Sequence, residues 1–242
     1  MQVLEPLRVH LKAVKIRKRK VRRRPLLTKK HKENRIQFAR KCLREKVDFN
    51  LVIFSDEEKL KLDVPDGYNY FWVGLEEKLD PVHYSVYFHK KKDVMVWLTI
   101  SSEGIIHIER VVGSINSDTY SDMITNDVLA AFHASHGTDF IFQQDNTPAH
   151  VTKTAKATLS NVGIQLLYWP ALSSDLNPVE NIWSLIVRRL YTGYQSFNSE
   201  EQLRAGIQRV VVAITKEEVL TYIRSMKDRL LNVVQRQGLY VQ

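Results

Sequence analysis

Two short runs of bulky apolar residues constrain this sequence more than any other feature, because each run is followed closely by an aspartate. The first run, LVIF, covers residues 51–54 and precedes Asp56, and the second, FIF, covers residues 140–142 and precedes Asp145. Continuous apolar runs of this length are typical of strands that are buried on both faces of a sheet. Since Asp is a poor strand former, we expect each aspartate where its strand ends. If the two strands are parallel neighbours, both carboxylates emerge at the same edge.

The rest of the chain predicts hairpin strands followed by alternating helices and strands. Further strands are expected at residues 68–72, 93–101, 105–112 and 164–169, and helices at 28–46, 117–135, 152–161, 178–191 and, as one or two helices, 199–230. Ser117 is the expected N-cap of the second helix. This order indicates an α/β domain with a mixed sheet. The domain is expected over residues 28–242, with its last helices at about 199–237, after an arm or linker of residues 1–27.

A third acidic residue lies at the predicted start of a helix. Asn177 is the expected N-cap, Pro178 the first helical residue and Glu180 the third. The apolar residues that follow recur at helical spacing, and they are Val179, Ile182, Trp183, Ile186, Val187 and Leu190. Because Glu180 borders this apolar stripe, we expect its carboxylate to face the sheet edge more than the solvent.

Three carboxylates at one edge would repel each other strongly, and a divalent cation relieves that repulsion. Mg²⁺ prefers hard oxygen ligands, and it keeps several waters and substrate phosphate oxygens as further ligands. Two such ions about 3.5–4 Å apart activate an attacking oxygen and stabilise a leaving one in phosphodiester chemistry. Asp56, Asp145 and Glu180 are therefore candidate ligands for two Mg²⁺ or Mn²⁺ ions.

Each of these residues also has a purely structural interpretation. Asp56 begins an acidic stretch that could be a solvated loop, and Asp145 opens a good turn sequence with Pro148. Glu180 could be the reciprocal partner of Asn177 in a capping box. Composition and spacing alone do not decide between these interpretations and the metal site.

Basic residues are concentrated in one run near the start of the chain. The formal net charge is +9, and residues 15–24 (KIRKRKVRRR) supply eight of these charges without an acidic residue. The basic residues of this arm are Lys15, Arg17, Lys18, Arg19, Lys20, Arg22, Arg23 and Arg24. Such an arm suits a polyanion, because neutralised phosphates release counterions, and it also suits nuclear import. The alternative is a solvated tail.

Cysteine content and hydropathy exclude several classes of protein. A single cysteine, Cys42, rules out an internal disulfide and a cysteine-based zinc site. No apolar run approaches the eighteen or so residues that a membrane span needs. A secretory signal has an apolar segment after its basic residues, and the basic N-terminal residues here are not followed by one. We therefore expect no membrane partner.

The residues around the three carboxylates resemble the Tc1/mariner transposases, most closely their Tc3-like branch. The matching segments are Phe54-Ser55-Asp56-Glu57 with Lys59, Gln143-Gln144-Asp145-Asn146 with Pro148 and His150, and Ser173 to Trp183 (SSDLNPVENIW). Between Asp145 and Glu180 lie 34 residues, which is the Tc1-type interval. The likeness runs from about Arg22 to Gly238.

This resemblance implies an RNase H-like fold, with a five-stranded mixed sheet flanked by helices. It implies cut-and-paste DNA transposition, in which water attacks a phosphodiester at the element's end and the freed 3′ hydroxyl then attacks target DNA. Asp56, Asp145 and Glu180 would be the catalytic residues and would bind two Mg²⁺ or Mn²⁺ ions. Double-stranded DNA would be the substrate, a homodimer the acting form, and the nucleus the location.

Two other functions are compatible with the same residues. The helix-turn-helix units of the family have no counterpart in residues 1–27, so a truncated or domesticated fragment, inactive but able to bind DNA through the arm, is one alternative. An RNase H-like nuclease that acts on RNA–DNA hybrids is another, although the 34-residue interval argues against it.

Three further residues carry narrower expectations. Asn146 and His150 are candidates for positioning DNA or a metal-bound water, and a packing role at a helix start is the alternative for His150. Leu98 stands where relatives often have glycine, so it is expected to crowd the sheet edge near Asp56.

Overall fold

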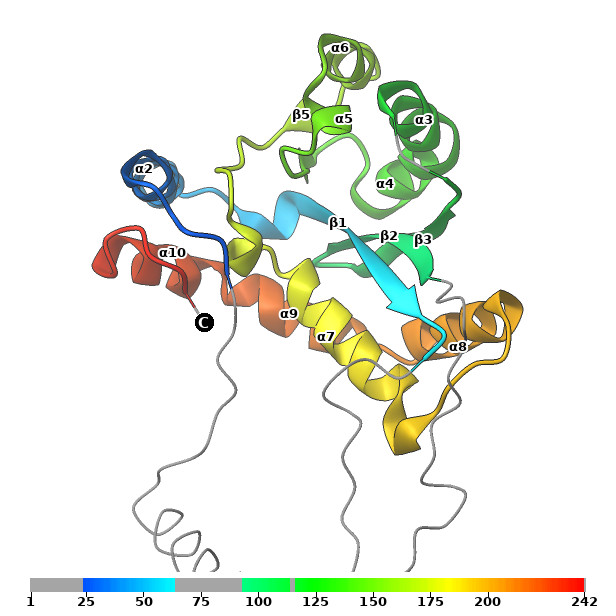
Figure 1. The fold of residues 1–242 in the computed structure, drawn as a ribbon. Coiled ribbons are helices and arrows are strands. Elements are labelled where there is room, and N and C mark those ends of the chain that lie inside the picture. The colour runs from blue at the N-terminus through cyan, green and yellow to red at the C-terminus, as the bar shows by residue number, and fades with distance from the viewer. Residues whose placement is uncertain (1–23, 64–92, 114–115, 242) are drawn as a thin grey trace, which may run out of the picture.

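A mixed sheet of five strands forms the centre of the computed structural model, which describes residues 24–63, 93–113 and 116–241 (Figure 1). The strand order is β3-β2-β1-β4-β5. The strands are β1 (Val52–Lys61), β2 (Asp93–Ser101), β3 (Gly104–Val111), β4 (Ile141–Gln143) and β5 (Gln165–Leu166). β1 pairs with β2 and β2 with β3 in antiparallel fashion, whereas β1 pairs with β4 and β4 with β5 in parallel. The predicted mixed α/β sheet is therefore confirmed.

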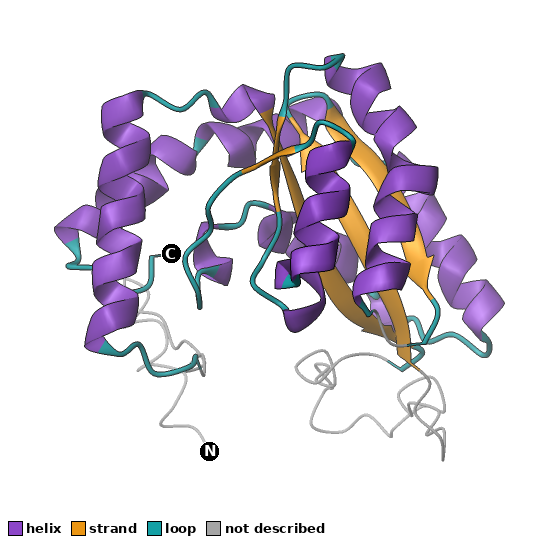
Figure 2. Cartoon of the chain, turned by 90° about the horizontal axis from the view of Figure 1, so that it is seen from above, coloured by secondary structure: helices purple, strands orange, loops and turns teal. Residues whose placement is uncertain are grey.

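The sheet separates two hydrophobic cores, one on each face, and successive side chains of β1 point alternately into one and the other. Val52 and Phe54 point into the larger core, and Ile53 between them points into the smaller one. Helices cover both faces, as Figure 2 shows. This is why the LVIF run has no polar position: both faces of the strand are covered.

Five helices cover the larger core. They are α2 (Lys29–Glu45), α7 (Val179–Leu190), α8 (Glu200–Val212), α9 (Lys216–Arg224) and α10 (Met226–Gln235). The apolar stripe predicted for α7 is buried at Val179, Ile182, Trp183, Ile186 and Leu190. The region 199–230 holds three helices and not one or two, because Thr215 caps a new helix after the end of α8 and the chain breaks again at Ser225.

The smaller core is covered by a helical run from α3 (Ser117–Asp122) through η3 (Met123–Val128) to α4 (Leu129–His136), and by α6 (Lys153–Asn161). The predicted helix over 117–135 is present, but η3 is a π-helical turn within it. Its N-cap is Asn116 and not Ser117, because the Asn116 side chain accepts hydrogen bonds from the backbone of Asp118 and Thr119.

Short helical turns complete the described chain: η1 (Phe49–Leu51), α5 (Pro148–Val151), η4 (Ser174–Leu176) and η5 (Thr192–Tyr194). The strand predicted at 164–169 is reduced to the two residues of β5, which pair only with β4 at the edge of the sheet. The strand predicted at 68–72 lies outside the described residues. Within the described part of the chain, no helix is both long enough and apolar enough to cross a bilayer.

Candidate functional site: a cluster of carboxylates at the β1–β4 junction

Asp56 lies inside β1, and the prediction that the strand ends there is wrong. β4 stops pairing with β1 at Phe54, where its partner is Gln143. β2 continues to pair with β1 beyond that point, with Leu98 opposite Asp56, so β1 runs on to Lys61. Asp56 therefore lies on a strand that is held firmly on one side, just past the place where the other neighbour ends.

Asp145 follows β4 by two residues and lies in the loop that leads to α5. β1 and β4 are parallel neighbours, which meets the condition under which both aspartates emerge at one edge, so Asp145 leaves the sheet next to Asp56. Thr147 fixes the carboxylate by donating its backbone N–H to Oδ1 (2.9 Å) and its hydroxyl to Oδ2 (2.7 Å). This side chain-to-backbone turn is the local conformation that Asp favours.

Glu180 lies in the first turn of α7. α7 begins at Val179 and Pro178 is its N-cap, so the helix starts one residue later than predicted, but Oδ1 of Asn177 accepts a hydrogen bond from the backbone N–H of Val179 at 3.1 Å. The backbone N–H of Asn177 donates to the carbonyl of Ser174 (2.9 Å), so it is not the partner that a capping box would give Glu180. The Asn177 Nδ2 donates to the Ser55 carbonyl at 3.0 Å, which joins the start of α7 to β1 beside Asp56.

The charges of Asp145 and Glu180 both act on Asp56. Burial raises the pKa of Asp56 to about 8, and the charges of Glu180, Glu57 and Asp145 contribute to this rise. The pKa of Glu180 is also raised, first by burial and then by Glu58, which is two residues after Asp56 on β1. Groups from a strand, a loop and a helix therefore lie within electrostatic reach of one another.

His150 is a buried residue that contacts Asp145 and Glu57. Its side chain is only 2% exposed, and its Nδ1 is 2.8 Å from Oδ1 of Asp145. Its Nε2 lies 3.3 Å from Oε1 of Glu57, without the alignment of a hydrogen bond. The ring packs on Tyr120 with 4.0 Å between centroids. The role expected for His150, positioning DNA or a metal-bound water, stays a prediction, and the buried ring could exert it only through Asp145 or Glu57.

The charge of His150 compensates the two carboxylates beside it. Burial lowers the pKa of His150, but the hydrogen bond with Asp145 and the carboxylate of Glu57 outweigh burial and raise that pKa to about 9. Burial in turn raises the pKa of Asp145, but the hydrogen bonds from His150 and Thr147 prevail and lower it. Asp145 is thus ionised at neutral pH, whereas Asp56 retains its proton.

Glu57 is a site residue that the sequence reasoning missed. It follows Asp56 directly, and alternation along a strand sends its side chain to the opposite face of the sheet, toward His150. The only signal in the sequence was this position next to Asp56. Gln144 is a second such residue: its Oε1 accepts from the Tyr120 hydroxyl (2.6 Å), and its Nε2 donates to the His150 carbonyl (2.9 Å).

The remaining predicted residues have mixed outcomes. Asn146 is exposed and donates to the carbonyl of Trp169 at 2.9 Å, so it restrains the segment between β5 and α7. Leu98 is fully buried in the larger core directly opposite Asp56, and the expected crowding of the sheet edge stays a prediction. Of the basic arm, Lys15 to Arg23 lie outside the described residues. Arg24 is exposed, and its positive charge partly offsets the rise in the pKa of Glu180 that burial and Glu58 cause.

The donor set suits a hard divalent cation, since all three groups are partly buried carboxylates, and burial together with the charges of Glu180 and Asp145 raises the pKa of Asp56. Within the described ranges, no three His, Cys, Asp or Glu side chains are already arranged around one point as a ready cage. Mg²⁺ is usually bound by one or two carboxylates, with water and substrate phosphates as its other ligands.

Residues 51–204, which contain all three carboxylates, match the family described as DDE superfamily endonuclease. The Tc3 transposase of Caenorhabditis elegans is 33% identical over 221 residues, which is 91% of this chain and 66% of that protein. The chain belongs to the Tc1/mariner family of DDE transposases. It spans just under two thirds of the length of the Tc3 relative.

Solved structures of another Tc1/mariner transposase, Mos1, have the same fold. The Mos1 paired-end complex with the left transposon end has a TM-score of 0.80 at 19% identity, covering 98% of this chain and 71% of that one. The Mos1 catalytic domain with raltegravir and Mg has a TM-score of 0.70 at 18% identity, covering 90% and 100%. The RNase H-like fold expected of this family is therefore confirmed.

Proposed function

We propose that this chain is the catalytic part of a cut-and-paste DNA transposase, which hydrolyses a phosphodiester at an element's end and joins the freed 3′ hydroxyl to target DNA. The observation that carries the proposal is the convergence of Asp56, Asp145 and Glu180 from three elements at the junction of β1 and β4. A partly buried carboxylate with two other carboxylates acting on it, as Asp56 has, is costly unless a cation or a proton compensates the charge.

The three carboxylates are proposed to hold two divalent ions, Mg²⁺ or Mn²⁺. When bound, such ions activate the attacking oxygen and stabilise the leaving oxygen of a phosphodiester. The protein's own part is to fix the ligands. Thr147 and His150 orient Asp145 through both carboxylate oxygens. Asn177 fixes the start of α7 against β1, and so sets the position of Glu180 relative to Asp56.

Double-stranded DNA is the proposed substrate and partner. The basic residues of the arm suit the phosphate backbone, and Arg24, where the described chain begins, lies within electrostatic reach of Glu180. A homodimer that bridges two ends is proposed by analogy with the Mos1 paired-end complex. The nucleus is the proposed location, since the same basic run suits nuclear import.

Plasmid nicking tests the proposal most directly. The purified chain is incubated with supercoiled plasmid in Mn²⁺, in Mg²⁺ and in chelator, beside two variants. Asp145→Asn keeps the size of the side chain and removes a proposed ligand. Asp139→Asn makes the same change on an exposed aspartate just before β4 and serves as the matched control.

The expected result is nicking that requires the metal, is lost in Asp145→Asn and is retained in Asp139→Asn. Equal nicking by both variants would contradict the proposed role of Asp145. DNA binding in low salt without any nicking would support the inactive fragment. Cleavage confined to an RNA–DNA hybrid would identify the chain as a hybrid nuclease.

A further inference from the structure

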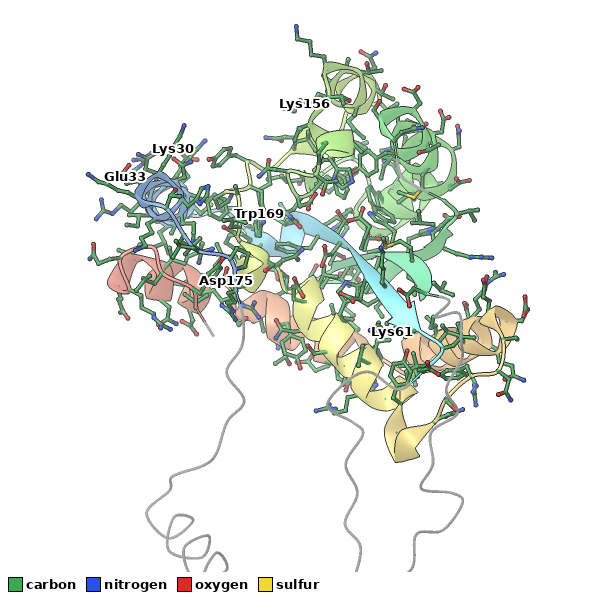
Figure 3. All side chains as sticks on the ribbon, in the orientation of Figure 1. Lys30, Glu33, Lys61, Lys156, Trp169 and Asp175 are labelled. Atoms are coloured by element: carbon green, nitrogen blue, oxygen red, sulfur yellow. The ribbon has the colours of Figure 1, made fainter. Side chains whose placement is uncertain are left out.

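The segment that leads into α7, residues 172–177, is held by one arginine from α2. Arg35 is fully buried, and its two terminal nitrogens donate to the two carboxylate oxygens of Asp175, each at 2.8 Å. The same guanidinium donates to the Ser173 hydroxyl (2.8 Å) and the Leu172 carbonyl (3.3 Å). A bidentate pair of this kind fixes direction as well as distance. Figure 3 shows Asp175 near the chain that enters α2.

The same ion pair also holds a third segment, residues 238–241. Arg35 donates from Nε to the Gly238 carbonyl (3.0 Å) and from Nη2 to the Leu239 carbonyl (3.3 Å). The backbone N–H of Val241 donates to Oδ2 of Asp175 at 2.7 Å. Three segments that are far apart in sequence therefore meet at a single buried charge pair.

Glycine is required where segment 238–241 crosses α2. Gly238 has a φ of +77°, and a Cβ at that position would lie 2.4 Å from the backbone oxygen of Lys32. Only a residue without a side chain allows this close approach. Segment 238–241 is therefore fitted closely against α2.

The network continues to both sides of Glu180. Arg229 of α10 donates to the Asp175 carbonyl at 3.1 Å and forms a short hydrogen bond with Oδ1 of Asn181. Asn177 is tied to β1 as described above. Asn177, three residues before Glu180, is thus bonded to the sheet, and Asn181, one residue after it, is bonded to the network around Asp175.

Stability alone does not explain a buried charge pair at this place. Removing two charges from water costs about as much as their attraction returns, and apolar residues of similar volume often stabilise a fold equally well. What such a pair adds is a defined geometry between the segments it joins. Here the joined segment is the one that carries a proposed metal ligand.

We propose that Arg35 and Asp175, completed by segment 238–241, are positioning residues that set Glu180 at the correct distance from Asp56. This inference rests on the proposed function, because it assigns a purpose to the geometry of the proposed metal site. Residues that orient metal ligands without touching the metal change metal affinity by about 10- to 100-fold when they are replaced.

Arg35→Lys tests the inference, because lysine keeps the charge and cannot form the two-pronged contact. Mn²⁺ binding is measured by calorimetry on the wild type, on Arg35→Lys and on Val219→Ala. Val219 is buried on α9, which packs on β2 and β3, so this control destabilises the fold away from residues 172–181. We expect about a 10- to 100-fold loss of Mn²⁺ affinity in Arg35→Lys and less than about a twofold change in the control.

Hydrogen exchange supplies a readout that a loss of global stability would not reproduce. Amides of residues 176–182 should exchange faster in Arg35→Lys than in Val219→Ala when the two proteins are compared at equal thermal stability. Wild-type Mn²⁺ affinity and wild-type exchange in Arg35→Lys would overturn the inference.

A milder variant covers the case in which Arg35→Lys does not fold. Deleting residues 241–242 removes the bond from Val241 to Asp175 and leaves the ion pair itself intact. We expect a smaller loss of Mn²⁺ affinity in the same direction, and an unchanged affinity would count against the inference. If the wild type itself bound no Mn²⁺ and Asp145→Asn behaved identically, the proposed function would fail instead.

Discussion

Replacing His150 with Phe tests the charge arrangement beneath Asp145. In the folded protein, burial lowers the pKa of His150, but the neighbouring carboxylates of Asp145 and Glu57 raise it from 6.5 to about 9. A raised histidine pKa stabilises the fold fully below pH 6.5, and this stabilisation is lost as the pH rises through 9. The difference between these two pKa values corresponds to about 3 kcal/mol.

Phe is the appropriate replacement because it keeps the ring packed on Tyr120 while it removes both nitrogens. For a protein of this size, about 3 kcal/mol corresponds to a decrease in Tm of roughly 6–12 °C at pH 6.5. The difference from wild type should shrink as the pH approaches 9.5, where only a lost neutral hydrogen bond of about 1 kcal/mol remains. Asp56, whose raised pKa also lowers stability as pH rises toward 8, contributes to both proteins alike.

Scanning calorimetry from pH 6 to 9.5, with chelator present, measures this difference. His133→Phe is the matched control, because His133 is an exposed histidine on α4, and its Tm should follow the wild type at every pH. If His150→Phe and the wild type gave parallel Tm curves, the ring would not carry the proposed charge and the reasoning would be refuted.

Three more predictions follow from the same geometry. Asp56 retains a proton below about pH 8, and metal binding should release that proton. Mn²⁺ affinity measured by calorimetry should therefore fall about tenfold per pH unit from pH 8 to pH 6. Asp56→Asn should abolish this pH dependence. Gly206→Ala would place a Cβ 2.9 Å from a ring carbon of Phe197, so chemical denaturation should show a loss of about 1–3 kcal/mol; an unchanged midpoint would mean that the ring moves freely. Asn177→Ala removes both the hydrogen bond to the backbone of Val179 at the start of α7 and the bond to the Ser55 carbonyl, so stability should fall by about 1–2 kcal/mol and nicking should fall further than that loss explains.

The fold was predictable in the places where local pattern decides structure. The LVIF and FIF runs identified two strands of the sheet, and the parallel pairing of these strands placed Asp56 and Asp145 together. The propensity argument failed for Asp56, because the hydrogen bonds that β2 offers to β1 from Phe54 to Lys61 outweigh the poor strand tendency of one residue. No local signal marks the partner that a strand finds at its other edge.

The parts of the site that the sequence did not reveal depend on contacts between distant residues. Glu57 was visible only as a neighbour of Asp56, and its meeting with His150 depends on which face of the sheet α5 covers. Arg35 looked like one more charge on a basic helix, whereas it is fully buried against Asp175. Hydrophobic periodicity identifies core positions, but it cannot identify a buried arginine whose partner lies 140 residues away.

The hydrogen bonds from Arg35 to Gly238 and Leu239 can form only late in synthesis of the chain. A ribosome makes α2 long before it makes Gly238, which follows Arg35 by 203 residues, and at ordinary rates of synthesis the interval is about 10–40 s. Until the chain has been made through Val241, Asp175 lacks one of its hydrogen bonds and the start of α7 is not fully fixed. If the proposed function is correct, the geometry of the site that would cut nucleic acid is completed only after segment 238–241 has been made and has closed over α2.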